Sequence, residues 1–94
     1  MNIRIDPHTL ERAEQRGASE EEIYDVIRTG FIVPAKYGRM AKAKVYPYNQ
    51  IRNGKQYEHK RVEVIYTSES DTTIVTVTVY VFYGKWERDD ANPL

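Results

Sequence analysis

Residues 6–17, DPHTLERAEQRG, decide the first part of the fold because they contain both ends of a helix. Asp6 suits the N-cap position, and Pro7 suits the first helical position, where its missing N–H would have no partner in any case. Gly17 supplies the left-handed residue that commonly ends a helix. The pattern therefore predicts a helix from about Pro7 to Arg16.

A second helix follows directly. Ser19 and Glu22 have the spacing of a capping box, and Gly30 stands just after Thr29, where the helical pattern stops. Apolar residues recur at helical spacing between these limits, at Ile23, Val26 and Ile27. The sequence thus predicts a second amphipathic helix that ends at about Thr29.

The period of the pattern changes to two from Phe31 onward. Asn53-Gly54 is a strong signal for a two-residue hairpin turn. The extended segments that we expect are Asn2–Ile5, Phe31–Val33, Lys42–Tyr48, Tyr57–Tyr66 and Thr72–Tyr83. This order predicts an α+β fold in which two N-terminal helices pack on one face of an antiparallel sheet of about four strands.

Length and composition exclude several classes of protein. Ninety-four residues suit a single domain, with residues 87–94 expected to form a loose tail. The absence of cysteine excludes disulfides, thiolate metal sites and a cysteine nucleophile. No apolar run is long enough to span a membrane, and the N-terminus lacks the apolar core of a signal peptide. We therefore expect a cytoplasmic protein.

The charge is segregated although its sum is zero. Residues 1–27 carry three arginines against seven acids, and residues 62–94 carry two basic residues against six acids, so each segment has a charge of −4. The segment between them has a single acid, Glu58, and a charge of +8. Its nine basic residues are Arg28, Lys36, Arg39, Lys42, Lys44, Arg52, Lys55, Lys60 and Arg61.

The basic segment also contains tyrosines, so cations for phosphates are interleaved with rings that can stack on bases. The residues that we predict to contact a nucleic acid are Arg16, Lys36, Arg39, Lys42, Lys44, Tyr46, Tyr48 and Lys60. The alternative is a solvated edge hairpin, because lysine and proline on edge strands also deter aggregation. The excess of eight charges favours contact with a nucleic acid.

Alternation predicts which residues share a face of the sheet. In the last strand Val75, Val77, Val79 and Val81 lie on one face. If this valine row meets the helices, polar residues gather on the opposite, open face, namely His59, Arg61, Glu63, Thr76, Thr78 and Tyr80. This set contains the groups that metal-free RNA cleavage needs: a base, a cation for the phosphorane and an acid. The alternative is a cross-strand polar cluster on an uncovered sheet face.

The first helix contains a second set of candidate catalytic residues. His8 and Arg12 lie nearly opposite Leu10 around the helix axis, away from the expected buried side. A neutral imidazole can act as a general base, and a guanidinium one turn away can hold a phosphate. The alternative is an ordinary solvated face. With two histidines and no cysteine, the sequence shows no recognised metal-ligand pattern, and we expect neither a metal nor another cofactor.

The chain resembles a small bacterial family called domain of unknown function 4258. The resemblance spans roughly residues 6–82 and rests on His8, Glu11-Arg12, the run RGASEEEI at 16–23, the helix end Val26-Ile27 and the strand segment Ile74–Val77. The chain has Thr9 and Ala18 where the family usually has alanine and isoleucine, and its central hairpin is longer and more basic. His8, Arg12, Arg16 and Thr76 occupy the signature positions.

By this resemblance, the fold is similar to that of the barnase, EndoU, colicin and RelE-like ribonuclease toxins. The resemblance implies helices on a curved antiparallel sheet whose other face binds RNA. The function that it implies is a metal-independent endoribonuclease, the toxin of a toxin–antitoxin pair, with RNA as its substrate and an antitoxin protein as its partner. The predicted catalytic residues are His8, Arg12, His59, Arg61, Thr76 and Tyr80. The alternatives are a non-catalytic nucleic-acid-binding module and a protein-interaction domain.

Overall fold

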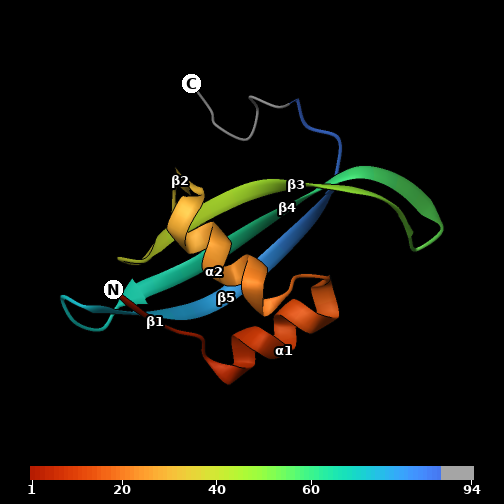
Figure 1. The fold of residues 1–94 in the computed structure, drawn as a ribbon. Helices are drawn as coiled ribbons and strands as arrows, with labels where there is room; N and C mark the ends of the chain where they lie inside the picture. The colour runs from red at the N-terminus through yellow and green to blue at the C-terminus, as the bar shows by residue number, and fades with distance from the viewer. Residues whose placement is uncertain (88–94) are drawn as a thin grey trace.

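The computed structural model describes residues 1–87, which form two helices and one five-stranded sheet (Figure 1). The elements in chain order are β1 (Asn2–Arg4), α1 (Pro7–Arg16), α2 (Glu20–Thr29), β2 (Phe31–Val33), β3 (Met40–Arg52), β4 (Lys55–Ser68) and β5 (Thr73–Gly84). Of the predicted tail only Glu87 is described, because residues 88–94 lie outside the described part of the chain. Within residues 1–87, neither helix is long and apolar enough to cross a membrane.

Both helices begin and end where the sequence predicts. The Asp6 side chain accepts a hydrogen bond of 2.8 Å from the backbone N–H of His8 and so caps α1. Gly17 ends α1 in the left-handed region, with φ of 95°. At α2, the Ser19 hydroxyl accepts from the backbone N–H of Glu22, and the Glu22 carboxylate accepts from that of Ser19. These local bonds fix the two helix starts without help from the rest of the chain.

The sheet has the order β1-β5-β4-β3-β2, and β2 to β5 form the predicted antiparallel meander. Asn53 and Gly54 both have positive φ, of 53° and 79°, which is the conformation of a type I′ hairpin turn between β3 and β4. The predicted hairpin is therefore confirmed. The long β3–β4 hairpin extends well beyond the end of β5 in Figure 1.

The expected number of strands was too low by one. The extended segment at the N-terminus is a fifth strand, β1, and it pairs in parallel with β5, with Asn2 opposite Thr73 and Arg4 opposite Val75. The sheet is therefore mixed, although four of its strands are antiparallel. The sequence could not show this pairing, because three residues carry too little pattern and their partner strand lies about 70 residues away.

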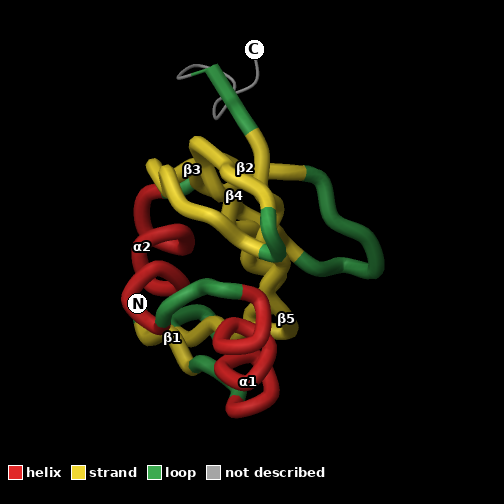
Figure 2. Tube along the Cα trace, turned by 90° about the vertical axis from the view of Figure 1, so that its right-hand side faces the viewer, coloured by secondary structure: helices red, strands yellow, loops and turns green. Residues whose placement is uncertain are grey.

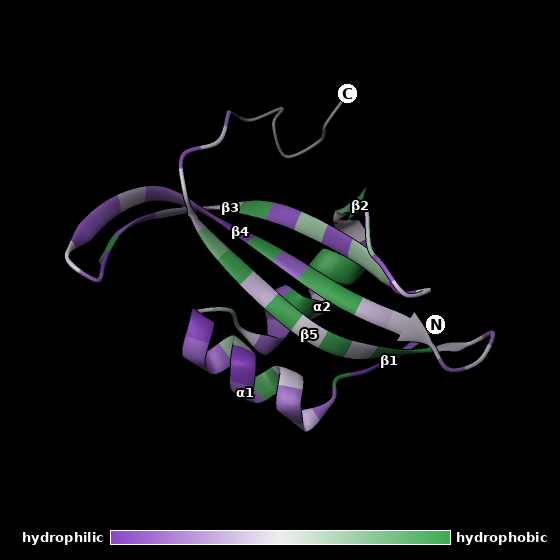
Figure 3. Ribbon diagram, turned by 180° about the vertical axis from the view of Figure 1, so that it is seen from behind, coloured by the Kyte–Doolittle hydropathy of each residue, from purple (hydrophilic) through white to green (hydrophobic). Residues whose placement is uncertain are grey.

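The helices cover one face of the sheet, as predicted (Figures 1 and 2). The apolar face of α2 packs on β3 and β4, and α1 packs on β5. Each buried valine or isoleucine side chain of this core stabilises the fold by about 1.5–3 kcal/mol relative to exposure. The fully buried members of this core are Ile23, Val26, Val62, Val64 and Val79. Seen from behind, in Figure 3, no helix covers the sheet, and we call this second side the open face.

A bulge in β5 changes which of its residues reach the open face. Ile65 pairs with Thr78 and Tyr66 pairs with Thr76, so Val77 is an extra residue between them. An extra residue reverses the alternation, because the side-chain period of a strand is two. Thr78 and Tyr80 lie on the open face as predicted, and Phe82, two residues after Tyr80, lies there as well. Thr76 was predicted there too, wrongly, since it lies on the helix side and is 3% exposed.

Candidate functional site

The open face carries two exposed aromatic side chains on β5. Tyr80 and Phe82 are 43% and 45% exposed, and their ring centroids lie 6.4 Å apart. In the neighbouring strand β4, Glu63 is directly opposite Tyr80, and Arg61 is directly opposite Phe82. Directly opposed side chains on one face of a sheet contact each other. The arrangement is therefore a two-by-two block of two rings, one carboxylate and one guanidinium.

Arg16 brings a second guanidinium to the edge of this block. Its Nη1 atom donates a 2.6 Å hydrogen bond to the carbonyl oxygen of Val79, and its Cζ atom lies 5.2 Å from the ring centroid of Tyr80. The carbonyl needs such a donor because, within residues 1–87, β1 pairs only with residues 73–75, so the edge of β5 that faces away from β4 has no partner strand at Val79. Arg16 therefore both anchors α1 and places positive charge beside Tyr80.

Thr76 has a structural role on the helix side of the sheet. Its hydroxyl accepts a 3.0 Å hydrogen bond from the backbone N–H of Asp6 and donates one of 2.9 Å to the hydroxyl of Thr9. Both threonines are buried. The Thr76 hydroxyl therefore fixes the start of α1 on β5 and does not face the open side.

The two histidines lie far apart. His8 is near the start of β5, because its backbone N–H is bonded to Asp6, which in turn is bonded to Thr76. His59 pairs with Gly84, at the other end of β5, and its Nδ1 atom accepts a 3.2 Å hydrogen bond from the backbone of Trp86. Gly84 lies eight positions after Thr76 along β5, or about 26 Å away. His8 and His59 therefore cannot form one acid–base pair.

His8 and Arg12 both lie on α1, outside the aromatic block. The His8 side chain is 72% exposed and has its Nδ1 atom 4.0 Å from a carboxylate oxygen of Glu11. Arg12 donates a 3.1 Å hydrogen bond to the side chain of Gln15 on the same helix. Neither contact joins these residues to Arg61 or Tyr80. The structure thus separates the two sets of catalytic residues that the sequence predicted.

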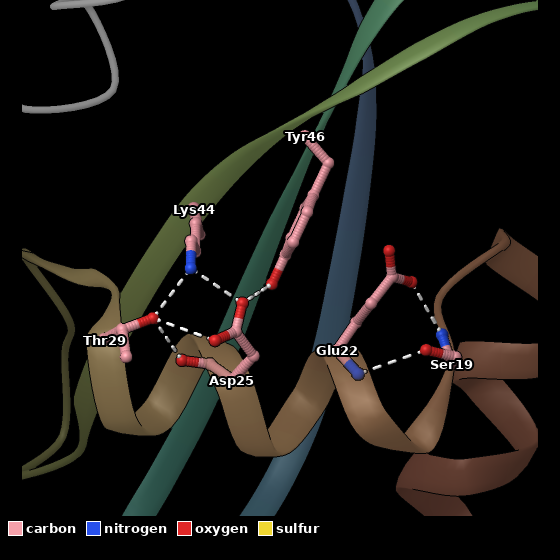
Figure 4. A network of polar contacts seen from close by, with 6 residues as sticks. All are labelled: Ser19, Glu22, Asp25, Thr29, Lys44 and Tyr46. Atoms are coloured by element: carbon pink, nitrogen blue, oxygen red, sulfur yellow. Dashed lines mark hydrogen bonds and ion pairs between the residues drawn. The ribbon is translucent and has the colours of Figure 1, made fainter.

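Two of the lysines predicted to contact a nucleic acid form hydrogen bonds with α2. Lys44 on β3 donates 2.8 Å hydrogen bonds to the Asp25 carboxylate and to the Thr29 hydroxyl (Figure 4). Lys42 donates a 2.9 Å bond to the carbonyl oxygen of Ile27 near the C-terminus of the helix. Both side chains lie on the helix side of the sheet, so they are not part of the open face.

Tyr46 completes this network. Its hydroxyl donates a 2.6 Å hydrogen bond to the same Asp25 carboxylate (Figure 4). The hydrogen bond from Lys44, followed by that from Tyr46, lowers the pKa of Asp25 from 3.8 to about 2. Burial, followed by the bond to Asp25, raises the pKa of Tyr46 well above its ordinary value of 10. The phenol is thus neutral and engaged inside the protein.

Lys60, which was also predicted to contact a nucleic acid, joins β4 to the helices. Its Nζ atom lies 2.8 Å from the Glu22 carboxylate and donates a second 2.8 Å bond to the carbonyl oxygen of Gly17. The side chains of Lys60 and Glu22 are only 12% and 21% exposed. The alternation of β4 already placed Lys60 in the row that meets the helices, so this role could have been inferred from the sequence.

The other predicted nucleic-acid contacts are spread over the surface. Lys36 and Arg39 are exposed in the loop between β2 and β3. Tyr48 packs against Tyr83, with ring centroids 5.1 Å apart. Arg61 lies on the open face, with its Cζ atom 5.5 Å from the ring of Phe31. The open face thus carries Arg61, with Arg16 at its edge. It also carries Phe82, which we did not predict as a site residue although it lies two positions after Tyr80 in the alternating strand.

The described residues contain no cluster of candidate metal ligands: within residues 1–87, no three histidine or carboxylate side chains are grouped so that they could hold an ion.

Comparison with known proteins gives one match. The model of a family described as a domain of unknown function (DUF4258) matches residues 5–81. No curated protein and no solved structure matches the chain. The matched segment runs from the residue before the cap of α1 to within three residues of the end of β5. It includes both helices and, on the open face, Arg61, Glu63 and Tyr80, but it ends one residue before Phe82. The chain belongs to the domain of unknown function 4258 family.

Proposed function

We propose that this protein binds single-stranded RNA on its open face and cleaves it as a small, metal-independent endoribonuclease. The observation that carries the proposal is the block formed by Tyr80, Phe82, Glu63 and Arg61, on a sheet face that no helix covers. Arg16 adds a second guanidinium at the ring of Tyr80.

The block suits an unpaired strand. Stacking of a base on an exposed aromatic ring contributes about 1–3 kcal/mol, and every base offers a flat face for it. A guanidinium can hold a phosphate through two parallel hydrogen bonds. Tyr80 and Phe82 supply the rings, and Arg16 and Arg61 supply the guanidinium groups. Bases in a duplex cannot reach such rings, so the preferred substrate is single-stranded.

The same block contains the groups for cleavage. Glu63 takes the proton from a 2′-hydroxyl, the 2′-oxygen attacks the adjacent phosphorus, and the bond to the 5′-oxygen breaks. Tyr80 gives its proton to the leaving 5′-oxygen, while Arg61 stabilises the charge on the phosphorane. The products are a 2′,3′-cyclic phosphate and a 5′-hydroxyl. Glu63 and Tyr80 are directly opposed, whereas the two histidines are separated by the length of β5.

Cleavage of a labelled RNA oligonucleotide in the presence of a chelator tests the proposal. Glu63→Gln should slow cleavage at least 100-fold and leave RNA affinity within about threefold, since it removes the base and keeps the shape. His8→Ala combined with His59→Ala should retain cleavage. Loss of cleavage in this double variant, with Glu63→Gln active, would assign the reaction to the histidines instead.

A non-catalytic RNA-binding module is the second candidate, because the exposed rings and the guanidinium groups of the block suffice for binding without any proton transfer. It predicts binding that Tyr80→Ala with Phe82→Ala abolishes, and no cleavage by the unchanged protein. Absence of RNA affinity at physiological salt would contradict both candidates and favour a protein-interaction domain.

We extend the first candidate to the toxin of a toxin–antitoxin pair, which is the role that the resemblance in the sequence implies. Induced expression in a bacterial host should then arrest growth, and expression of the Glu63→Gln variant at the same level should not. Continued growth with the unchanged protein would contradict the toxin role and leave RNA binding in place.

A further inference from the structure

A cavity lies where β5 ends beside the β3–β4 hairpin. Residues 55–58 of the hairpin and residues 83–85 line it, and its volume is about 310 Å³, at the lower end of the range for small-ligand sites. We call it the notch. It exists because Gly84 is the last residue of β5 and pairs with His59, whereas β4 begins four residues earlier, at Lys55.

The notch contains an unpaired strand edge. Within residues 1–87, β4 pairs with β3 along residues 55–57, but no strand pairs with residues 55–58 on the side that β5 occupies farther along. Alternate backbone N–H groups along this stretch therefore face an edge that, within residues 1–87, carries no partner strand. Backbone N–H groups at a sheet edge are suitable donors for an anion.

The walls combine aromatic rings with positive charge. Tyr57 and Tyr83 both line the notch, and their rings pack against each other with centroids 5.7 Å apart. The Nζ atom of Lys55 is 5.6 Å from the Tyr57 ring centroid. Lys85 lies across the notch, where it is 3.9 Å from the Glu58 carboxylate. Two lysines against one carboxylate leave a net positive lining.

The ring of Tyr83 is held in place by its neighbours. Its hydroxyl donates a 2.6 Å hydrogen bond to the carbonyl oxygen of Arg16, and the Cζ atom of Arg52 lies 4.7 Å from its ring centroid. Tyr48 packs against it as well. This wall is therefore a preformed surface, and a ligand need not order it.

We propose that the notch binds one nucleotide unit, with the base against Tyr57 and the phosphate at Lys55, Lys85 and the unpaired backbone. A nucleoside monophosphate has both required parts, a flat ring and a compact anion. As a position for a nucleotide of a bound RNA strand, the inference rests on the proposed function. Gly84 follows Phe82 by two residues, or about 7 Å along β5, so one strand can occupy the open face and the notch together.

Trp86 offers a direct readout of the notch. It is the only tryptophan of the chain, and its ring packs against Gly84, where an added methyl group would lie 3.4 Å from the ring. Tryptophan fluorescence should therefore change when adenosine monophosphate enters the notch. Inorganic phosphate alone should bind at least tenfold more weakly, because it lacks the ring.

The variants separate the notch from the open face. Lys55→Glu with Lys85→Glu should weaken binding of adenosine monophosphate at least tenfold, and Tyr57→Leu should weaken it several-fold. Lys36→Glu, a change at an exposed lysine outside the notch, is the matched control and should have no effect. Tyr80→Ala with Phe82→Ala should weaken RNA binding and leave binding of adenosine monophosphate unchanged.

Failure of the notch proposal and failure of the open-face proposal would give different results. If fluorescence does not respond to adenosine monophosphate up to about 10 mM while RNA still binds, the notch proposal is overturned and the open-face proposal stands. If adenosine monophosphate binds but RNA does not, the notch is a site for a free nucleotide and the proposed function fails. Equal affinity for inorganic phosphate and adenosine monophosphate would overturn the assignment of a nucleotide.

Discussion

The hydroxyl of Thr76 shows how much one buried polar group decides in this protein. It connects the start of α1 to β5 through Asp6 and Thr9, in a region where both threonines are inaccessible to solvent. The threonine belongs to the signature by which the chain resembles its family, and the structure gives it a role in folding. Arg16, another signature residue, also has a structural role, because it bonds to the Val79 carbonyl. Its position beside the ring of Tyr80 would in addition allow it to contact a ligand.

Thr76→Val tests the first of these roles. Valine keeps the shape but leaves the Asp6 N–H without its partner and removes the bond to Thr9, so we expect a loss of about 1–3 kcal/mol in the free energy of unfolding. Urea denaturation measures it. The control is Thr78→Val, which changes a partly exposed residue on the open face and should cost less than about 0.5 kcal/mol. Equal losses in the two variants would contradict the assignment.

Because the pKa of Tyr46 is raised in the folded protein, we expect the free energy of unfolding to decrease at alkaline pH. The unfolded chain ionises first as the pH passes 10. The stability contributed by the neutral phenol is therefore complete below pH 10 and falls above it. We expect the advantage of the unchanged protein over Tyr46→Phe to be present at pH 8 and to shrink at pH 10.5 and above. Urea denaturation at these pH values would show a constant difference if the interpretation is wrong.

At the scale of the elements, α2 is held on the sheet by a polar rim around an apolar centre. Ile23 and Val26 are fully buried beneath it, while Lys44 and Lys60 reach from the strands to its acids at Asp25 and Glu22. The Lys60–Glu22 pair is the less exposed of these two ion pairs. The capping carboxylate of α2 therefore also joins the helix to β4.

Lys60→Met is expected to destabilise the protein by about 2 kcal/mol, because it leaves a half-buried carboxylate and the Gly17 carbonyl without a donor. Lys36→Met, at an exposed loop position, should change stability by less than about 0.5 kcal/mol. Thermal denaturation of the two variants at pH 7 compares them. A similar loss in both would mean that the buried position of Lys60 does not matter.

At the scale of the whole molecule, the segregated charges meet each other across the interface between the helices and the sheet. The acids of α2 face the lysines of β3 and β4, so much of the basic excess is neutralised within the protein. The open face retains Arg61, with Arg16 at its rim. RNA bound there should therefore neutralise few charges.

The salt dependence of RNA binding tests this view. Single strands give a slope of about 0.7 per phosphate neutralised in a plot of log affinity against log salt. We expect a slope of about −2 from two or three accessible cations, whereas all eight excess charges of the basic segment would give about −6. Fluorescence anisotropy between 50 and 300 mM salt measures the slope. A slope near −6 would mean that the lysines now paired with α2 reach the RNA.

The sequence by itself determined the parts of this protein that depend on neighbours in the chain. The caps at Asp6, Gly17 and Ser19 fix both helices, and Asn53-Gly54 fixes the hairpin turn, because each acts through backbone bonds within a few residues. Alternation also predicted the face of Tyr80 correctly.

Only the tertiary structure decided what depends on distant partners. The parallel pairing of β1 with β5 and the bulge at Val77 arise from contacts between segments far apart in sequence, and the bulge alone moved Thr76 to the helix side. The count of basic residues could not show that Lys42, Lys44 and Lys60 bond to the helices, since a charge sum contains no direction. The notch is likewise decided by where β5 stops relative to β4, because its walls come from residues nearly 30 positions apart.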